Sequence, residues 1–405
     1  MEGTNMAAEN KKVVFLTGAT GHVGRNLIPR ILREDELSLL VVLVRAESDR
    51  DLVDRLETLL SSLSPAVDPE TARHRIQAVR GDITLERFGM SEAQYHELAS
   101  RVTHIIHSAA NVRFRMPLAE ARKINVEGTK NVMALARLAR SAGRLERVAH
   151  ISTAFISGNR SGIIKEDELD CGQGFSNTYE QSKYEAEIFL RQACRDLPLV
   201  IFRPSIIVGD SRSGATSAFN VLYIPLKYIA RGLVRFIPCS SSVPLDVVPV
   251  DYICQAICHI LFQAKDSQGQ TYHLCAGRKK ATTVGEVIGL ALDYFRRIWP
   301  DKKNLRLRFI SVHWMIALRM VEPCLGQAWK KVLLKMRAFF PYMKLIRFFD
   351  TAKAEAALRG TRITCPPFKS YFQILLQYCL YTNWGEQEPS VSPSRLAPLP
   401  QSQQT

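Results

Sequence analysis

The sequence lacks the features that would place the chain in a membrane or outside the cell. Its first residues, MEGTNMAAENKK, are polar and contain no apolar core of a secretion signal. No stretch reaches the ~18 uncharged apolar residues that a membrane-spanning helix needs. The nearest run, from Ser370 to Trp384, is interrupted by Gln373, Gln377 and Asn383 and is expected to be a packed helix. We therefore expect a cytoplasmic protein.

Cysteine pairs at the spacing of a metal site are also missing. The nine cysteines are scattered along the chain. Cys254, Cys258 and His259 share a helical stretch, but their spacing matches no usual zinc site, so we expect buried thiols and no metal. An odd number of cysteines without a signal peptide indicates a reducing cytosol.

Acidic residues are few relative to basic ones. The chain has 54 Lys and Arg against 39 Asp and Glu, a net charge of +15. Such an excess suits nucleic acid, an anionic membrane surface, or phosphate-rich ligands such as a dinucleotide and coenzyme A. No nucleic-acid-binding motif is present, so we expect no nucleic-acid partner and favour the other two.

What the sequence does contain is a regular alternation of strand and helix patterns. The apolar, strand-like runs are 13–17, 39–44, 75–79, 103–107, 147–152 and 199–203. The helical patterns between them are 22–33, 48–62, 91–100, 117–142 and 178–197. This alternation predicts an α/β fold with a Rossmann-like, doubly wound parallel sheet. Pro29 should kink the first helix.

Beyond residue 210 the alternation fades, which predicts a smaller, mostly helical C-terminal substrate lobe. The expected organisation is a flexible N-terminus (1–11), a nucleotide-binding domain (12–210), a substrate-binding lobe with segments returning to the sheet (211–384) and a disordered tail (385–405). Within the lobe, segment 302–347 holds eleven Lys and Arg and a single acidic residue. That segment is either a surface for anions, such as a membrane, or a solvated helical face.

The glycines after the first strand predict a dinucleotide site. Gly18, Gly21 and Gly24 lie between an apolar strand and an amphipathic helix, where backbone can approach a pyrophosphate at the helix N-terminus. Arg45 directly follows the second strand, and Arg25 follows the last glycine. Arginine there suits the 2′-phosphate of NADP(H), whereas a carboxylate would suit NAD.

A Tyr-x-x-x-Lys pair points to proton transfer. Tyr179 and Lys183 lie one helical turn apart, and Thr153 ends the preceding strand, so the three groups can meet at the carboxyl ends of the strands. A lysine cation favours the phenolate, so we expect Lys183 to lower the pKa of Tyr179. A second match, Tyr223 with Lys227, has no such hydroxyl partner and is expected to be structural.

Several motifs together resemble one enzyme family. Extended short-chain dehydrogenase/reductases carry, in the same order, motifs similar to TGATGHVG, GDIT, HSAANV, INVEGT, ISTAF, YEQSK and FRPSIIVG. The segments LVRAES, GDITLERFGMSEAQYHEL and HSAANVRFRMPLAEARKINVEGTKNV resemble the thioester-reductase and male-sterility-type fatty acyl-CoA reductase branch. This resemblance covers residues 12–275.

The resemblance implies a role for each matching residue. The implied catalytic residues are Thr153, Tyr179 and Lys183, with Asn125 as a supporting asparagine, and Lys183 would also hold the nicotinamide ribose. The implied cofactor-binding residues are Gly18, Thr20, Gly21, His22, Val23, Gly24, Arg25, Arg45, Asp82, Ile83, Ala109, Ala110, Lys183, Pro204 and Ser205. The three strand histidines His104, His107 and His150 are expected to be packed rather than catalytic.

The expected activity is NADPH-dependent reduction of an acyl thioester to an aldehyde, with further reduction to the alcohol left open. No adenylation or carrier domain is recognisable, so the thioester, on coenzyme A or a carrier protein, would come from elsewhere. A sterol or alcohol dehydrogenase, or a nucleotide-sugar epimerase or dehydratase, of the same fold is an alternative. A non-catalytic NADP(H)-binding regulator is a second one, which the Thr153, Tyr179 and Lys183 set disfavours because a binder needs no proton donor.

Overall fold

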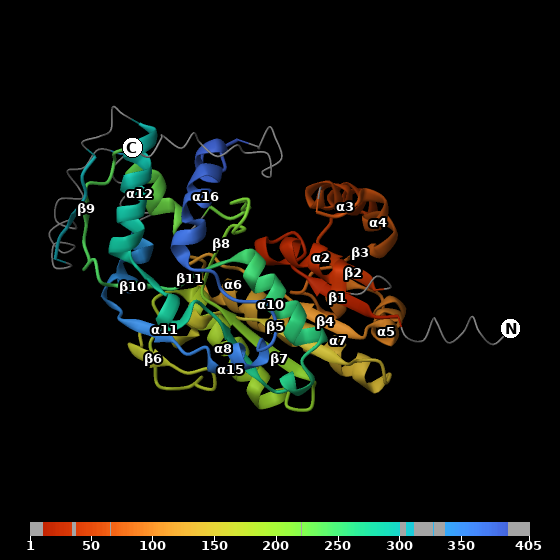
Figure 1. The fold of residues 1–405 in the computed structure, drawn as a ribbon. Coiled ribbons are helices and arrows are strands. Elements are labelled where there is room, and N and C mark those ends of the chain that lie inside the picture. Colours follow the sequence, from red (N-terminus) through yellow and green to blue (C-terminus); the bar gives the residue numbers. More distant parts are fainter. Residues whose placement is uncertain are drawn as a thin grey trace.

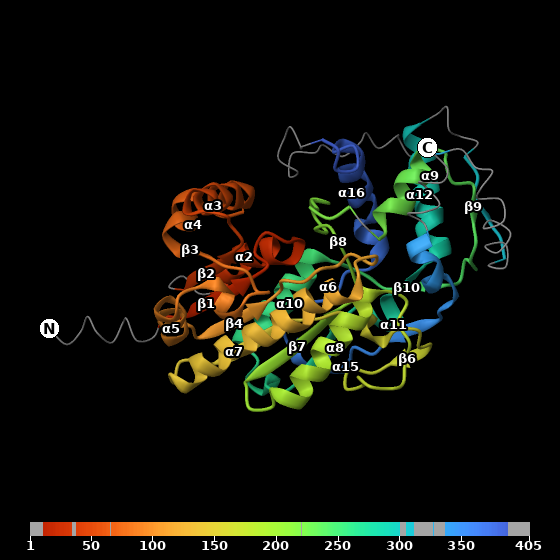
Figure 2. The ribbon, with the colours of Figure 1, turned by 180° about the vertical axis from the view of Figure 1, so that it is seen from behind.

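The computed structural model describes residues 11–34, 38–64, 66–219, 221–299, 305–311, 327 and 337–387. A parallel sheet with helices on both faces forms one part of the molecule, and a mostly helical lobe lies beside it (Figures 1 and 2). This is the α/β architecture that the alternation of strands and helices predicts.

The sheet has seven strands in the order β12-β7-β5-β4-β1-β2-β3. They are β1 (Val13–Thr17), β2 (Leu39–Val44), β3 (Ile76–Arg80), β4 (His104–His107), β5 (Arg147–Ile151), β7 (Leu199–Pro204) and β12 (Thr271–Leu274). Every pairing is parallel, and β1 and β7 are buried along their whole length, as strands covered on both faces are. The strand order reverses between β1 and β4, where such sheets bind ligands at the carboxyl ends.

Two apolar layers attach the helices to the sheet. One layer joins it to α2, α3, α4, α10 and α15, and the other joins it to α5, α7 and α8. The second set comes forward when the molecule is seen from behind (Figure 2). The helices of these layers are α2 (His22–Glu34), α3 (Asp49–Leu63), α4 (Pro69–Arg75), α5 (Glu92–Arg101), α7 (Gly128–Ser141), α8 (Thr178–Ala193), α10 (Val250–Phe262) and α15 (Ala352–Ala357), and the short helix α6 (Leu118–Arg122) precedes α7 in the chain.

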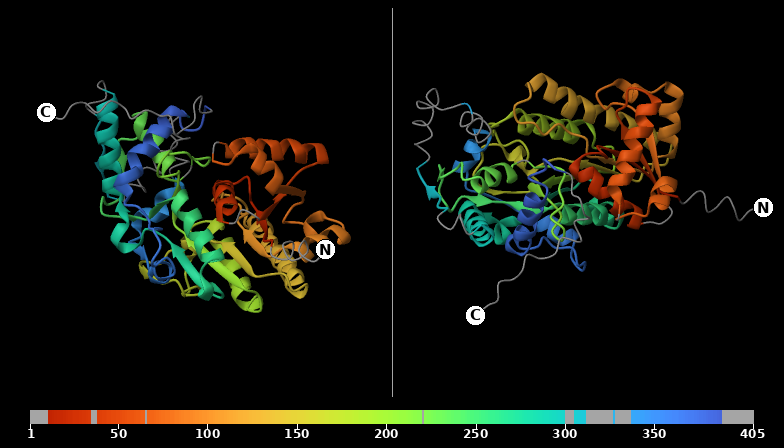
Figure 3. Two further views of the ribbon diagram at one scale, coloured as in Figure 1. Left: turned by 45° about the vertical axis from the view of Figure 1, so that its right-hand side comes forward. Right: turned by 90° about the horizontal axis from the view of Figure 1, so that it is seen from above.

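A third apolar cluster forms the lobe, seen from two more directions in Figure 3. Its helices are α9 (Tyr223–Ala230), α12 (Val284–Ile298) and α16 (Phe368–Tyr381). Helix α12 begins with a capping box, in which Thr283 accepts from the N–H of Glu286 at 3.1 Å and Glu286 accepts from the N–H of Thr283 at 3.0 Å. Helix α16 packs into the cluster, and none of the described helices is long and apolar enough to span a membrane.

Among the described residues, four short strand pairs lie outside the seven-stranded sheet. These pairs are β8 (Ile206–Val208) with β11 (Val247–Pro249), β6 (Gly162–Ile164) with β15 (Arg347–Phe349), β10 (Pro244–Leu245) with β13 (Thr282–Thr283), and β9 (Phe236–Ile237) with β14 (Arg308–Phe309). The remaining short elements are η1 (Glu86–Gly89), η2 (Lys123–Glu127), η3 (Ala154–Ser157), η4 (Lys265–Ser267), α11 (Gly277–Lys280) and η7 (Arg337–Lys344). Segments from the end of the chain thus return to the sheet domain.

Three details differ from the sequence-based expectation or lie beyond it. Helix α2 continues through Pro29 as one element, and the kink expected there stays a prediction. The helix expected over 117–142 is instead two α-helices separated by the π-helical turn η2. Of the basic segment 302–347, the structure describes 305–311, 327 and 337–347, so its expected role as a whole lies outside the described residues, as do those of residues 1–10 and 388–405.

A buried ion pair fixes α8 against the sheet. The side chains of Arg203 on β7 and Glu187 on α8 are 1% and 0% exposed, and Arg203 Nη2 donates to Glu187 Oε2 at 2.7 Å. Ser152, directly after β5, donates its hydroxyl to the same carboxylate. Arg203 also donates to the carbonyl of Glu168 at 2.8 Å. These directional bonds set the position of α8 relative to two adjacent strands.

We predict that Arg203→Met lowers the free energy of unfolding by about 3–5 kcal/mol, because it leaves Glu187 buried without its partner. Urea denaturation followed by circular dichroism measures the change. The control is Arg101→Met, which removes an exposed pair with Glu97 and should cost less than about 1 kcal/mol. Equal stability of the two variants would contradict the prediction.

Candidate functional site

The turn between β1 and α2 is a cradle without room for side chains. Gly18 has φ +75°, and a Cβ added there would lie 2.6 Å from the backbone nitrogen of Ala109. A Cβ on Gly24 would lie 2.1 Å from the carbonyl oxygen of Gly18. Gly21 donates its N–H to that same carbonyl at 2.9 Å. Backbone can therefore approach a pyrophosphate closely, beside the N-terminus of α2.

Two side chains of the first turn of α2 border this cradle. His22 Nε2 lies 3.2 Å from the carbonyl oxygen of Val208, and its Nδ1 lies 3.3 Å from the hydroxyl of Ser217. Burial lowers the pKa of His22, so the ring is neutral at pH 7. Arg25 Nε is buried and has no hydrogen-bond partner within the described part of the chain. An unpaired guanidinium nitrogen beside the cradle fits a phosphate group.

The other predicted cofactor residues lie at or near the carboxyl ends of the strands. Asp82, just after β3, accepts from the N–H of Thr84 at 2.8 Å, and Ile83 packs beside Gly128. Ser205, which follows the last residue of β7, donates its hydroxyl to the buried carboxylate of Asp246. The remaining positions are the exposed Thr20 and Arg45 and the half-buried Val23, Ala109 and Ala110, together with the buried Pro204.

Thr153, Tyr179 and Lys183 meet at the same edge of the sheet. Thr153 follows β5, and its hydroxyl contacts the phenol of Tyr179, which favours the phenolate. Asn177 caps α8 by accepting from the N–H of Glu180 at 3.0 Å, so that the helix starts just before Tyr179. Tyr179 and Lys183 are one turn apart on the face of α8 that is directed at the sheet.

The electrostatics of these groups correct one expectation from the sequence. Burial raises the pKa of Tyr179 to about 12 and outweighs its contact with Thr153. We expected Lys183 to lower this pKa, whereas it lies above the ordinary value of a tyrosine. Lys183 Nζ instead donates to the carbonyl of Ile151 at 2.8 Å and lies 3.2 Å from His150 Nε2. Burial lowers the pKa of Lys183 to about 8.

Asn125 contacts neither Tyr179 nor Lys183 through the hydrogen bonds of its side chain. It lies in the π-helical turn η2, a feature often found at functional sites. Its Oδ1 accepts from the N–H of Asn111 at 2.8 Å, and its Nδ2 donates to the Asn111 carbonyl at 3.1 Å and to Ser182 at 2.9 Å. Asn125 therefore joins the loop after β4 to the helix that carries Tyr179 and Lys183.

The three strand histidines are buried, and two of them lie closer to the site than the sequence indicates. The rings of His107 and His150 are 5.3 Å apart, and His107 contacts Thr17 and Thr129 through its two nitrogens. Burial and the charge of Lys183 lower the pKa values of both histidines. The contact of His150 with Lys183 was missed because strand alternation shows only that the histidines point into the core.

Tyr223, from the second Tyr-x-x-x-Lys match, is structural as expected. Its side chain is 2% exposed, and its hydroxyl oxygen accepts from the N–H of Gly209 at 2.8 Å. Lys227 pairs with Glu386 instead of turning toward a reactive group.

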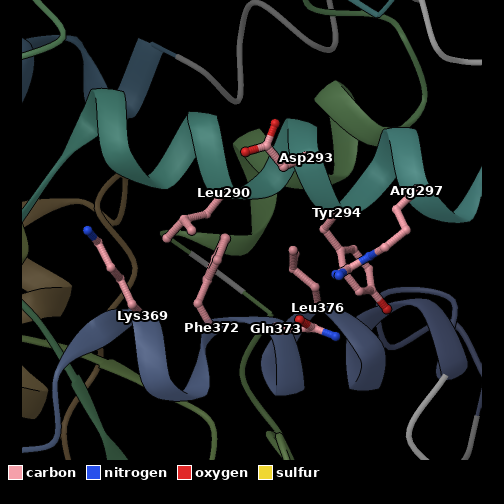
Figure 4. Close-up of a pocket in the computed structure, with 8 residues that line it drawn as sticks. All are labelled: Leu290, Asp293, Tyr294, Arg297, Lys369, Phe372, Gln373 and Leu376. Carbon is pink, nitrogen blue, oxygen red and sulfur yellow. The ribbon is translucent and has the colours of Figure 1, made fainter. Parts of the chain in front are cut away.

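A pocket of about 260 Å³ between α12 and α16 is distinct from the predicted site (Figure 4). It is lined by Leu290, Asp293, Tyr294, Arg297, Lys369, Phe372, Gln373 and Leu376. None of these is a predicted cofactor or catalytic residue. The candidate site is therefore defined by the convergence of side chains at the strand ends.

The cradle and the sheet order define a dinucleotide-binding protein of the Rossmann type. Residues 16–257 match the male sterility protein family, and the chain belongs to that family. It is similar to the fatty acyl-CoA reductase wat of Drosophila melanogaster, with 31% identity over an alignment of 278 residues that covers 61% of this chain and 53% of that protein. It is also similar to the L-2-aminoadipate reductase of Schizosaccharomyces pombe, with 30% identity, covering 62% of this chain and 18% of that protein.

A solved structure extends the similarity over nearly the whole chain. The terminal R domain from the myxalamid PKS-NRPS biosynthetic pathway superposes with a TM-score of 0.78 and 28% identity, covering 92% of this chain and 91% of that domain. The family and fold expected from the motifs are thus confirmed, and both indicate a nicotinamide cofactor. The chain spans about half the length of the Drosophila relative and a smaller share of the yeast one.

We predict that Gly24→Ala weakens NADPH and NADH binding by about tenfold or more, because the new Cβ pushes the turn away from the position that contacts the pyrophosphate. Quenching or enhancement of nucleotide fluorescence measures the affinity. Gly289→Ala is the matched control, since nothing lies within 4 Å of its added Cβ. Unchanged affinity in a folded Gly24→Ala protein would contradict the role of the cradle.

Proposed function

We propose that this chain is an NADPH-dependent reductase that converts an acyl thioester to an aldehyde. The observation that carries the proposal is the meeting of Thr153, Tyr179 and Lys183 at the edge of the sheet that also carries the glycine cradle, two strands away. Its support from the comparisons is that relatives named as a fatty acyl-CoA reductase and an aminoadipate reductase share this part of the chain. The thioester would be carried by coenzyme A or by a separate carrier protein.

Tyr179 and Thr153 act on the carbonyl oxygen of the substrate. Because burial raises the pKa of Tyr179 to about 12, the phenol keeps its proton at neutral pH and donates it to an oxygen that gains negative charge. The Thr153 hydroxyl donates a second hydrogen bond to that oxygen. Reduced nicotinamide, when bound, would supply the hydride that adds to the carbonyl carbon. The hydroxyl of the resulting thiohemiacetal returns its proton to Tyr179 as the carbon–sulfur bond breaks, and the departing thiolate takes a proton from solvent, so that aldehyde and thiol are released.

Lys183 and the residues around the cradle hold the cofactor in this proposal. Lys183, oriented by the Ile151 carbonyl, binds the nicotinamide ribose while it is charged. Arg25 and Arg45 bind the 2′-phosphate, which favours NADPH over NADH. The pyrophosphate lies against residues 18–24, the adenine beside Asp82 and Ile83, and the trough between them is lined by Ala109, Ala110, Pro204 and Ser205. Asn125 is a positioning residue, since its side chain joins Asn111 in the loop after β4 to Ser182 on α8.

The proposal predicts that medium- and long-chain acyl-CoAs cause NADPH oxidation with release of aldehyde or alcohol, and that Tyr179→Phe lowers kcat by about 10²-fold or more. The absorbance of NADPH and chromatography of the products measure both. NADPH binding by Tyr179→Phe should persist. Tyr223→Phe, from the structural Tyr-x-x-x-Lys match, should retain turnover.

Two results would contradict this function. One is tight NADPH binding without turnover on acyl-CoAs or on carrier-protein thioesters. The other is turnover that is unchanged in Tyr179→Phe.

We predict that kcat/KM falls as the pH rises through about 8, because Lys183 is charged below its pKa of about 8 and neutral above it. Tyr179, with a pKa of about 12, keeps its proton over the same range and does not cause the decline. Initial rates between pH 6 and 10 measure the profile. Any residual activity of Lys183→Arg should lack this decline, and a flat wild-type profile to pH 10 would overturn the assignment.

A further inference from the structure

The residue next to the candidate catalytic tyrosine is a fully buried acid. Glu180 is 0% exposed, and burial raises the pKa of its carboxyl. One of its oxygens accepts from the N–H of Ser176 at 2.9 Å. The other accepts from the hydroxyl of Tyr342, a residue 162 positions further along the chain. A carboxyl in such a dry place must be hydrogen-bonded at both oxygens, and Tyr342 completes the set.

Tyr342 is held from several sides at once. Asn177 Nδ2 donates to its hydroxyl oxygen at 2.7 Å, so the phenol is bonded to the cap and to the first turn of α8 together. Phe155, two residues after Thr153, meets the ring edge to face at 5.8 Å. The guanidinium of Arg347 lies 4.7 Å from the centre of the Phe155 ring and 5.6 Å from that of Tyr342. The orientation of the Tyr342 ring is therefore fixed by the sheet domain.

Three aromatic rings form a row that begins at the candidate catalytic residue. The rings of Tyr179 and Phe114 are stacked with centres 6.2 Å apart, and the next distance, from Phe114 to Tyr342, is 6.3 Å. Phe114 is placed by the loop after β4, where Thr178 donates to the carbonyl of Met116 at 2.8 Å. The polar atoms of Tyr342 point at α8, so the row offers ring faces and edges to anything bound beside Tyr179.

We propose that Tyr342, supported by Glu180, is a specificity-determining residue of the reductase: with Phe114 it forms the wall against which the apolar part of the acyl group packs. This inference rests on the proposed function, and it assigns to one ring of the C-terminal lobe the selection of chain length. Methylene groups a few bonds from the carbonyl lie along the row, whereas a two-carbon acyl group ends before it. Each CH₂ that leaves water against the rings adds to binding in proportion to its buried area.

The test compares acetyl-, butyryl-, octanoyl- and dodecanoyl-CoA as ligands and as substrates of the full-length chain. Equilibrium dialysis gives the Kd of each thioester, and NADPH oxidation gives kcat/KM. In Tyr342→Ala we expect both values to worsen about tenfold for dodecanoyl-CoA, equivalent to about 1.4 kcal/mol, and less than twofold for acetyl-CoA. Tyr342→Phe keeps the ring without its hydrogen bond to Glu180 and should fall between wild type and Tyr342→Ala.

The matched control is Phe236→Ala, which removes an aromatic ring that is 56% exposed on β9 of the same lobe. It should change neither value at any chain length. If Tyr342→Ala loses affinity and kcat/KM equally for all four thioesters, or loses neither, Tyr342 does not select chain length and the proposal is contradicted. Phe114→Ala, which removes the other ring of the proposed wall, keeps the test valid should Tyr342→Ala fold poorly, because it should lose the preference for dodecanoyl-CoA in the same way.

The two proposals fail in different ways. Suppose that the wild type binds dodecanoyl-CoA more tightly than acetyl-CoA, that Tyr342→Ala lacks this preference, and that neither protein oxidises NADPH. This result would support the role of Tyr342 in binding the acyl chain and contradict the reductase function. If both wild type and Tyr342→Ala turn over with the same chain-length preference, the reductase function is supported and the role of Tyr342 in chain-length selection is contradicted. If the wild type neither binds nor reduces any of the four thioesters, both are overturned.

Discussion

The position of α8 against the sheet is the constraint on which the candidate site depends. Tyr179, Lys183 and Glu187 are spaced four residues apart and form a stripe along one face of this helix. Glu187 bonds both Arg203 on β7 and Ser152 after β5, so a shift of the helix along its axis breaks charge-assisted bonds in a dry interior. Apolar packing alone tolerates small slides, whereas these directional bonds do not. The buried pair thus fixes the distance between Tyr179 on α8 and Thr153, because Thr153 directly follows Ser152 in the chain.

Burial also determines the protonation states of Tyr179 and Lys183. Burial disfavours the charged form of each group, which raises the pKa of Tyr179 and lowers that of Lys183. Both effects come from the same surroundings, and they leave a protonated phenol beside an amine that is still charged at neutral pH. Tyr179 is therefore suited to donate a hydrogen bond and a proton to an oxygen, and a pre-formed phenolate is not required. Thioester reduction needs such a donor, since negative charge develops on the carbonyl oxygen.

The parts of the molecule that were predictable from the sequence are local in the chain. The strands of the sheet follow from short apolar runs, and the cradle follows from three glycines within seven residues, because a turn of this type needs only neighbouring residues. The pKa values of Tyr179 and Lys183 were not predictable, since they depend on burial by distant segments. The contact of Tyr342 with Glu180 is equally invisible, because a tyrosine at position 342 carries no signal of what it will meet. The π-helical turn around Asn125 interrupts a pattern that is otherwise typical of one long helix.

The cofactor cradle is built from local contacts, whereas the proposed acyl-binding wall is built from contacts between distant parts of the chain. The cofactor cradle is one strand, one turn and one helix, and its geometry leaves no space for variation at Gly18 or Gly24. The wall beside Tyr179 is assembled from the loop after β4 and from a segment near the end of the chain, anchored by the pairing of β15 with β6 and by Arg347, which donates to the Gly158 carbonyl at 2.7 Å. In the proposed reductase, substitutions in that segment would alter what packs beside the carbonyl without moving the groups that act on it. A single sheet domain can thus keep its chemistry while the lobe changes the acyl group that it accepts.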